Sequence, residues 1–274
     1  MKPVIRKQTK RKDVQMGKII AVANQKGGVG KTTTCVNLSA ALTEMGAQIL
    51  LCDMDPQGNA TSGLGIKKDR DAMSIYNVLI DGVDALSAIV KTQYCDALAA
   101  NQILSGAGIE LVMMDGREYV LKKTLSNVKD RYDYILIDCP PSLEMLTLNS
   151  LCAADTVLIP VQCEYFALEG LSDLMSSIRM IKKVLNPTLA LEGVLLTMFD
   201  GRTNFSSQVA SEIKKFFKEK TFNAVIPRSI RLAEAPSHGK AIIDYDKASR
   251  GAQSYIELAK EIVKRNAKQP HHGL

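Results

Sequence analysis

Runs of isoleucine, valine and leucine alternate along the chain with longer segments in which apolar residues recur at helical spacing. The apolar runs predict strands at 18–24, 48–53, 133–138, 155–161, 190–198 and 223–227. The periodic segments predict helices at 32–45, 72–80, 117–130, 143–153, 167–185, 205–219 and 251–267. Such alternation is typical of a mostly parallel, doubly wound sheet flanked by helices, because the crossover helices cover both faces of the sheet. We therefore expect a single α/β domain over residues 16–267, within which residues 81–115 mix both signals and stay unassigned.

A glycine-rich turn follows the first predicted strand and opens the first predicted helix. Residues 18–33 read K-I-I-A-V-A-N-Q-K-G-G-V-G-K-T-T. Gly27, Gly28 and Gly30 let backbone N–H groups approach a phosphate, and the positive end of the following helix favours the negative charge. Lys31 can reach the β and γ phosphates, and the Thr32 hydroxyl can ligate Mg²⁺. The complete strand, loop and helix indicate a P-loop NTPase domain.

Two residues in this loop depart from the ordinary P-loop. Gln25 stands where the consensus has its first glycine, and Lys26 precedes the paired glycines. The result is the deviant Walker A pattern, K-G-G-x-G-K-T. A loop lysine is by default solvated, but the place of Lys26 inside the motif favours a functional role over that default.

Three aspartates follow predicted strands. Asp53 and Asp55 end the second strand in L-L-C-D-M-D-P-Q-G-N, and Asp138 ends the third in Y-D-Y-I-L-I-D-C-P-P-S, the form of a Walker B carboxylate. Ligands of open α/β sheets bind at the carboxyl ends of strands. Each aspartate alone would be assigned a capping or turn role. Three of them behind one P-loop indicate a site that holds metal-bound water and orients an attacking water.

Five segments together resemble a known family. They read N-Q-K-G-G-V-G-K-T-T-T, D-M-D-P-Q-G-N-A-T-S-G-L-G, I-D-C-P-P-S-L, I-P-V-Q-C-E-Y-F-A-L-E-G-L and I-P-R-S-I-R-L-A-E-A-P-S-H-G-K. In this order, across roughly 16–265, they resemble the ParA/Soj family of chromosome and plasmid partitioning ATPases. The resemblance implies ATP and Mg²⁺ as cofactors, hydrolysis of ATP, and a homodimer that encloses the nucleotides.

The resemblance also implies roles for individual residues. It implies that Lys26 crosses the dimer interface to the partner's phosphates, and that Lys31 and Asp55 act in hydrolysis, Asp55 by positioning the water. The carboxylates around Mg²⁺ would be Asp53 and Asp138, beside Thr32. The nucleotide-contacting set would be Lys26, Gly27, Gly28, Val29, Gly30, Lys31, Thr32 and Thr33 of the loop, with Pro227 and Arg228 near the adenine.

The family's partners are expected as well. Arg202 and Arg231 match positions of DNA-contacting arginines, with Lys247 and Arg250 as weaker neighbours. The resemblance implies that the ATP-bound dimer binds double-stranded DNA without sequence preference. It also implies a ParB-type centromere-binding protein that stimulates hydrolysis, and a cytoplasmic, nucleoid-associated location.

The distribution of charge along the chain indicates where a DNA contact would lie. Residues 1–15 hold six basic residues and one acidic residue, so +5 of the net +6 lies there and the rest of the chain carries +1. A nearly neutral body places any nucleic-acid contact in local lysine and arginine clusters. We expect the basic extension 1–15 to be disordered and residues 268–274 to form a frayed tail. The extension either adds nonspecific attraction for phosphate or has no function.

Cysteines and apolar runs restrict the class further. No run approaches the roughly 18 apolar residues of a membrane-spanning helix, and the basic N-terminus lacks the apolar core of a signal peptide. The six cysteines contain no C-x-x-C pair and are interpreted as structural; they are Cys35, Cys52, Cys95, Cys139, Cys152 and Cys163.

Other classes share parts of this pattern. A MinD-like membrane-cycling ATPase has the same loop and a C-terminal amphipathic helix, but Glu257 and Glu261 interrupt a cationic face here, so packing onto the core is the expected fate of that helix. An iron–sulfur ATPase would need ligand loops around Cys95 or Cys139, whose surroundings do not resemble such loops. A dinucleotide dehydrogenase is disfavoured because Thr33 takes the place of the third glycine of its motif.

Overall fold

The computed structural model describes residues 17–164 and 167–267. The extension 1–15 and the tail 268–274 lie outside the described residues, so their expected disorder stays a prediction. The described residues form one eight-stranded sheet in the order β3-β4-β2-β5-β1-β6-β7-β8. All neighbouring strands run parallel except β3 and β4, which are antiparallel. The strands are β1 Lys18–Val22, β2 Ile49–Asp53, β3 Ile89–Lys91, β4 Asp96–Leu98, β5 Tyr134–Asp138, β6 Thr156–Gln162, β7 Ala190–Phe199 and β8 Thr221–Pro227.

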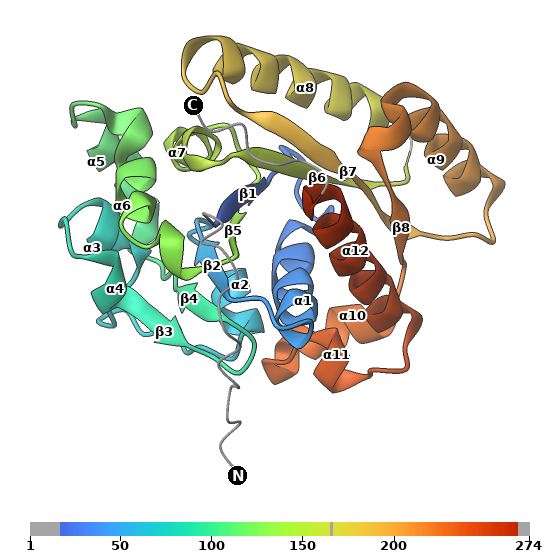
Figure 1. Ribbon diagram of the computed structural model, residues 1–274, viewed down its shortest axis with the longest axis horizontal. Helices are drawn as coiled ribbons and strands as arrows, with labels where there is room; N and C mark the ends of the chain where they lie inside the picture. Colours follow the sequence, from blue (N-terminus) through green and yellow to red (C-terminus); the bar gives the residue numbers. More distant parts are fainter. Residues whose placement is uncertain (1–16, 165–166, 268–274) are drawn as a thin grey trace.

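Helices cover both faces of the sheet. The helices are α1 Lys31–Glu44, α2 Asn59–Gly63, α3 Ile75–Leu79, α4 Ala85–Ala88, α5 Leu104–Val112, α6 Val120–Ser126, α7 Met145–Ala153, α8 Ala167–Val184, α9 Asn204–Phe217, α10 Ile230–Glu234, α11 Ile242–Tyr245 and α12 Arg250–Ala267. One apolar layer joins the sheet to α1, α2 and α10 to α12, and the other joins it to α3 to α9. Figure 1 shows α1 and α12 side by side in front of the sheet. The predicted single α/β domain with a mostly parallel, doubly wound sheet is therefore confirmed.

The central strands are buried on both faces. Every residue of β1 and β2 is buried, as are four of the five residues of β5. Their Ile, Leu and Val side chains alternate between the two apolar layers, because successive residues of a strand point to opposite faces. This double burial is why these strands appear in the sequence as continuous apolar runs.

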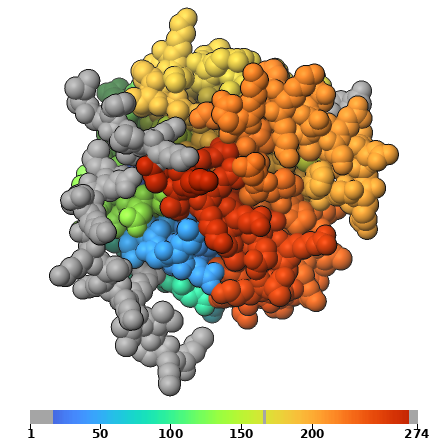
Figure 2. Space-filling model, turned by 45° about the vertical axis from the view of Figure 1, so that its right-hand side comes forward, coloured from blue at the N-terminus to red at the C-terminus, as the bar shows by residue number. Residues whose placement is uncertain are grey.

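The C-terminal helix α12 packs onto the core, as expected. Tyr255, Leu258, Ala259 and Ile262 are buried against α1 and β8. Glu261 accepts hydrogen bonds from the backbone N–H groups of Asn223 and Ala224 in β8, so its polar face is engaged as well. In Figure 2, α12 forms a red band between blue residues from early in the chain and the orange region of α9 and β8. No helix of the described residues is long and apolar enough to cross a membrane.

Several predicted boundaries differ from the structure. The predicted helix 117–130 is divided into a 3-10 turn, α6 and a second 3-10 turn. Helix α6 ends at Ser126 and is capped by Asn127, a residue type that is unfavourable inside helices. Helix α3 begins only after Ser74, which forms a capping box with Asn77. The unassigned segment 81–115 contains α4, β3, β4 and α5, whose short lengths account for its mixed signals.

Candidate nucleotide-binding site

The glycine-rich loop joins β1 to α1 at the carboxyl edge of the sheet. Gly28 and Gly30 have φ values of 74° and 92°, a region that residues with a Cβ rarely adopt. Asn24 fixes the start of the loop, since its Oδ1 accepts from the Lys26 N–H at 3.0 Å and its Nδ2 donates to the Pro160 carbonyl at 2.8 Å. The far side is held by Thr197, whose hydroxyl donates to the Val29 carbonyl at 2.8 Å. These hydrogen bonds hold the loop in its conformation up to the first residue of α1.

The two lysines of the loop lie in different environments. Lys31, the first residue of α1, is buried, and its Nζ donates to the Lys26 carbonyl at 3.0 Å. Burial lowers the pKa of Lys31, and the nearby Asp138 carboxylate opposes that effect. The side chain of Lys26 is 45% exposed and forms an ion pair with Glu164, which follows β6. Lys31 is therefore fixed inside the site, and Lys26 lies at its rim.

Thr32, Asp53 and Asp138 meet below the loop. The Thr32 hydroxyl donates to Asp138 Oδ2 at 2.7 Å. Asp53 and Asp138 are directly opposed in register where β2 and β5 end. Asp138 also accepts from the Cys35 thiol, with an Sγ to Oδ1 distance of 3.7 Å. The three residues predicted to surround a metal therefore come together, although they belong to three separate segments.

Burial makes this pair of carboxylates hard to ionise. It raises the pKa of Asp53 to about 6, against hydrogen bonds from Thr61 that favour the charged form. It also raises the pKa of Asp138 well above its usual range, and the charge of Asp53 adds to that effect. A bound cation would stabilise both charges. The electrostatics of the pair therefore fit a metal beside the loop.

Thr61 is a supporting residue that sequence reasoning missed. Its backbone N–H and its hydroxyl donate to Asp53 Oδ2 at 2.8 and 2.7 Å, and its hydroxyl accepts from the Ala100 N–H at 2.8 Å. Thr61 thus ties Asp53 to the segment that follows β4. The signal that could have identified Thr61 was its place in the segment D-M-D-P-Q-G-N-A-T-S-G-L-G, eight residues after Asp53.

Asp55 is buried just beyond the end of β2. Its Oδ1 accepts from the Gln57 N–H at 2.9 Å, and its carbonyl accepts from the Gly58 N–H at 2.8 Å. The side chain therefore does form the turn contacts that an aspartate in a loop commonly makes.

These residues fit magnesium better than a protein-only metal cage. Within residues 17–164 and 167–267, no group of three or more His, Cys, Asp or Glu side chains could hold a metal ion. Mg²⁺ is usually held by one or two carboxylates, by waters and by substrate phosphates. Thr32 and Asp138, supported by Asp53, supply that kind of oxygen donor beside a phosphate loop.

A cavity of about 860 Å³ opens beyond the ends of β7 and β8. Strand β7 connects this cavity to the glycine-rich loop: Thr197 donates to the Val29 carbonyl, and Phe199, two residues further on, lines the cavity. The Arg228 N–H donates to the Phe199 carbonyl at 3.1 Å and joins the two strand ends. The lining residues are Phe199, Asp200, Gly201, Arg202, Pro227, Arg228, Ser229, Ile230 and Arg250. Pro227 and Arg228, expected near an adenine, thus line a cavity at the ends of β7 and β8.

The predicted DNA-contacting arginines are exposed and paired with carboxylates. Arg202, with 88% of its side chain exposed, contacts Asp200 at 2.7 Å. Arg231 contacts Glu234 at 3.4 Å and Asp246 at 3.7 Å. Their hydrogen bonds and ion pairs are consistent with solvated surface charges and leave their DNA role a prediction.

The cysteine positions disfavour an iron–sulfur site. All six cysteines are buried. Cys95 and Cys139 belong to the apolar layers on opposite faces of the sheet. Burial raises the pKa of the Cys139 thiol to about 12, which opposes the thiolate form that a cluster requires. We interpret both as core residues.

A deviant phosphate loop, a buried loop lysine and paired aspartates at strand ends define a P-loop ATPase. A family model described as "AAA domain" matches residues 17–191. The chain is 57% identical over 250 residues to the sporulation initiation inhibitor protein Soj of Bacillus subtilis, covering 90% of this chain and 99% of the relative. It is 51% identical over 253 residues to the chromosome partitioning protein ParA of Myxococcus xanthus, covering 92% of this chain and 89% of the relative. The chain belongs to the ParA/Soj family of ATPases.

A solved structure supports the cofactor assignment at the level of the family. The cobyrinic acid a,c-diamide synthase of Mycobacterium smegmatis, crystallised with ADP and magnesium, is 38% identical to this chain. Its TM-score is 0.82, covering 92% of this chain and 96% of that structure. Nucleotide and Mg²⁺ binding are thus found in the structural neighbours of this fold.

Proposed function

We propose that this ATPase is a DNA-partitioning switch whose ATP-bound form is a homodimer that binds double-stranded DNA nonspecifically. The observation that carries the proposal is the contrast between its two loop lysines. Lys31 is buried and directed within its own loop, whereas Lys26 lies at the rim in an exposed ion pair. An exposed lysine inside a phosphate loop can reach the phosphates of a second chain.

The other residues of the site have separate roles in ATP binding and hydrolysis. Backbone N–H groups of residues 27–33 and the Lys31 ammonium bind the phosphates of ATP. Thr32, Asp138 and Asp53 would hold Mg²⁺, which would offset negative charge on the phosphates. Asp55 orients the attacking water, and Pro227 and Arg228 bind the adenine in the cavity at the ends of β7 and β8. The second lysine, Lys26, adds charge at the partner's phosphates as the dimer closes.

DNA binding is assigned to Arg202 and Arg231, with Lys247 and Arg250 nearby. Because residues 16–274 carry a net charge of only +1, one chain has little general attraction for DNA. Dimerisation doubles the local arginines on one surface and so strengthens contacts to the phosphate backbone. A ParB-type partner would stimulate hydrolysis and release the DNA, and the protein would act in the cytoplasm on the nucleoid.

Sizing the chain by light scattering without nucleotide, with ADP and with ATP tests the switch. We expect a dimer with ATP, and a monomer with ADP or without nucleotide. Lys31→Ala should lose nucleotide binding, whereas Lys26→Ala should bind ATP and stay monomeric. An ATP dimer of normal stability in Lys26→Ala would refute the cross-subunit role. The basic extension 1–15 is retained in all variants so that its charge is constant.

A further inference from the structure

The loop after β7 places one carboxylate between the cavity and the proposed DNA surface. Asp200 accepts two hydrogen bonds from the Arg202 guanidinium, from Nε to Oδ1 at 2.8 Å and from Nη2 to Oδ2 at 2.7 Å. The Arg202 backbone N–H also donates to Oδ1 at 3.1 Å. Both residues line the cavity. The pair is therefore two-pronged and closes a tight turn.

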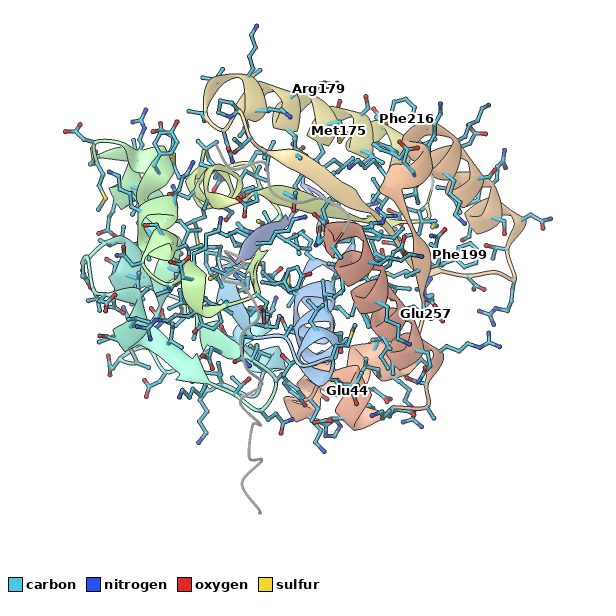
Figure 3. All side chains as sticks on the ribbon, in the orientation of Figure 1. Glu44, Met175, Arg179, Phe199, Phe216 and Glu257 are labelled. Carbon is cyan, nitrogen blue, oxygen red and sulfur yellow. The ribbon has the colours of Figure 1, made fainter. Side chains whose placement is uncertain are left out.

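The backbone holds this carboxylate in place. Met198 has a φ of 49°, which is rare for a residue with a Cβ and persists only where surrounding structure enforces it. Phe199 follows at the end of β7, where Figure 3 shows it close to β8. The Arg228 N–H holds its carbonyl at 3.1 Å. Asp200 is the next residue, so the backbone that leads into it is restrained by the strained Met198 and by the contact of Phe199 with Arg228, the residue after β8.

The two partners differ in exposure. The Arg202 side chain is 88% exposed and that of Asp200 only 22%. The carboxylate is thus sheltered while the guanidinium faces solvent. Asp200 occupies the Nε and Nη2 donors, an edge that can also bind a phosphate in a two-pronged manner. The hydrogen bonds from Arg202 lower the pKa of Asp200 to about 2, so the carboxylate remains charged at neutral pH.

We propose that Asp200 competes with DNA phosphate for the Arg202 guanidinium and thereby sets the DNA affinity of the ATP-bound chain. The inference rests on the proposed function, because it requires DNA binding through Arg202. The competing ligand is a phosphodiester backbone. Arg231 is held less tightly, at 3.4 Å from Glu234 and 3.7 Å from Asp246, so its carboxylates compete less.

Asp200→Asn is the direct test, because it removes the charge and keeps the shape. With saturating ATP, we expect DNA affinity to rise roughly threefold per protomer, or about tenfold for a dimer, as suits loss of an exposed ion pair. The salt dependence should steepen, because a freed Arg202 neutralises additional phosphate. The measurement is fluorescence anisotropy on two labelled duplexes of unrelated sequence, across a salt series.

Two controls separate competition from a general change of charge. Asp173→Asn removes an exposed carboxylate on α8 that forms no ion pair with a described residue. Helix α8 also carries Met175 and Arg179, which Figure 3 labels. The substitution should leave affinity within about twofold of the wild type, since isolated surface charges contribute little. In an Arg202→Ala background, Asp200→Asn should give no gain. A gain there, or equal gains in Asp200→Asn and Asp173→Asn, would overturn the inference.

Two further results are distinguishable from these. If the wild-type ATP dimer does not bind DNA at low salt, the proposed function fails. If Asp200→Asn and Asp200→Ser both lose the ATP-dependent dimer while the wild type keeps it, Asp200 belongs to nucleotide binding and the inference is wrong.

Discussion

Thr61→Val should destabilise the protein by loosening the support of Asp53. The substitution keeps the shape of the side chain and replaces its hydroxyl with a methyl group. Asp53 then loses the hydrogen bond of 2.7 Å, and the Ala100 N–H loses the acceptor at 2.8 Å. Thr61 and Ala100 are each 1% exposed, so water cannot easily replace either bond.

The magnitude follows from these two losses. An orphaned buried N–H costs about 1–3 kcal/mol, and a hydrogen bond to a charged group contributes about 1.5–3 kcal/mol. A buried methyl group returns about 0.8 kcal/mol. After partial relaxation, we expect a net loss of about 2–4 kcal/mol in the free energy of unfolding. The assay is reversible urea unfolding followed by circular dichroism, without nucleotide.

Thr147→Val is the matched control. The Thr147 side chain is 2% exposed, and its hydroxyl has no hydrogen-bond partner among the described residues. The same chemical change should therefore be neutral or stabilise by up to about 1 kcal/mol, since it removes an unsatisfied buried group. A cost below about 1 kcal/mol for Thr61→Val, or equal costs at both sites, would refute the assignment of Thr61 as the support of Asp53.

Three other predictions address the site. Asp55→Ala should bind ATP and form a persistent dimer while turnover falls by about 10²-fold or more, and a wild-type turnover rate would exclude its role. Arg202→Ala and Arg231→Ala should each weaken binding to unrelated duplexes equally and flatten the salt slope by about one unit per lost phosphate contact; unequal effects on two sequences would indicate base contacts. Because burial raises the pKa of Asp53 from 3.8 to about 6 in the folded chain, its charging opposes folding progressively as pH rises between these values. Asp53→Asn should therefore gain thermal stability relative to the wild type over that window, without Mg²⁺, and a constant difference would contradict the shift.

The fold was readable from sequence where strands are buried on both faces. In β1, β2 and β5, burial on both faces produces continuous apolar runs, and these predicted the centre of the sheet. The strands β3 and β4 have three residues each, too few to show a period. The short helices α10 and α11 depend on packing against α1 and α12, which local propensity does not encode.

The site was readable where its residues share one motif. The loop residues 26–33 follow one another in sequence, so their convergence needs no tertiary information. The registry of Asp53 with Asp138 depends on β5 lying between β1 and β2, which is a property of the sheet order. Asn24 and Thr197 were missed because amides and hydroxyls near loops have many ordinary uses, and only the folded chain shows which group each one contacts.

In the proposed function, buried residues carry the chemistry and exposed residues carry the recognition. Lys31, Asp53 and Asp138 are buried, and strand register and the start of α1 set their positions during folding. Lys26 and Arg202 are exposed, and each is paired with a carboxylate of its own chain. An exposed ion pair contributes little to stability, so exchanging its partner for an external phosphate disturbs the fold little. Substitutions of the buried group should thus change stability and turnover together, whereas substitutions of the exposed pairs should change assembly and DNA affinity at nearly constant stability. The proposed switch requires that separation, because each of its cycles would exchange the recognition contacts while the catalytic contacts stay in place.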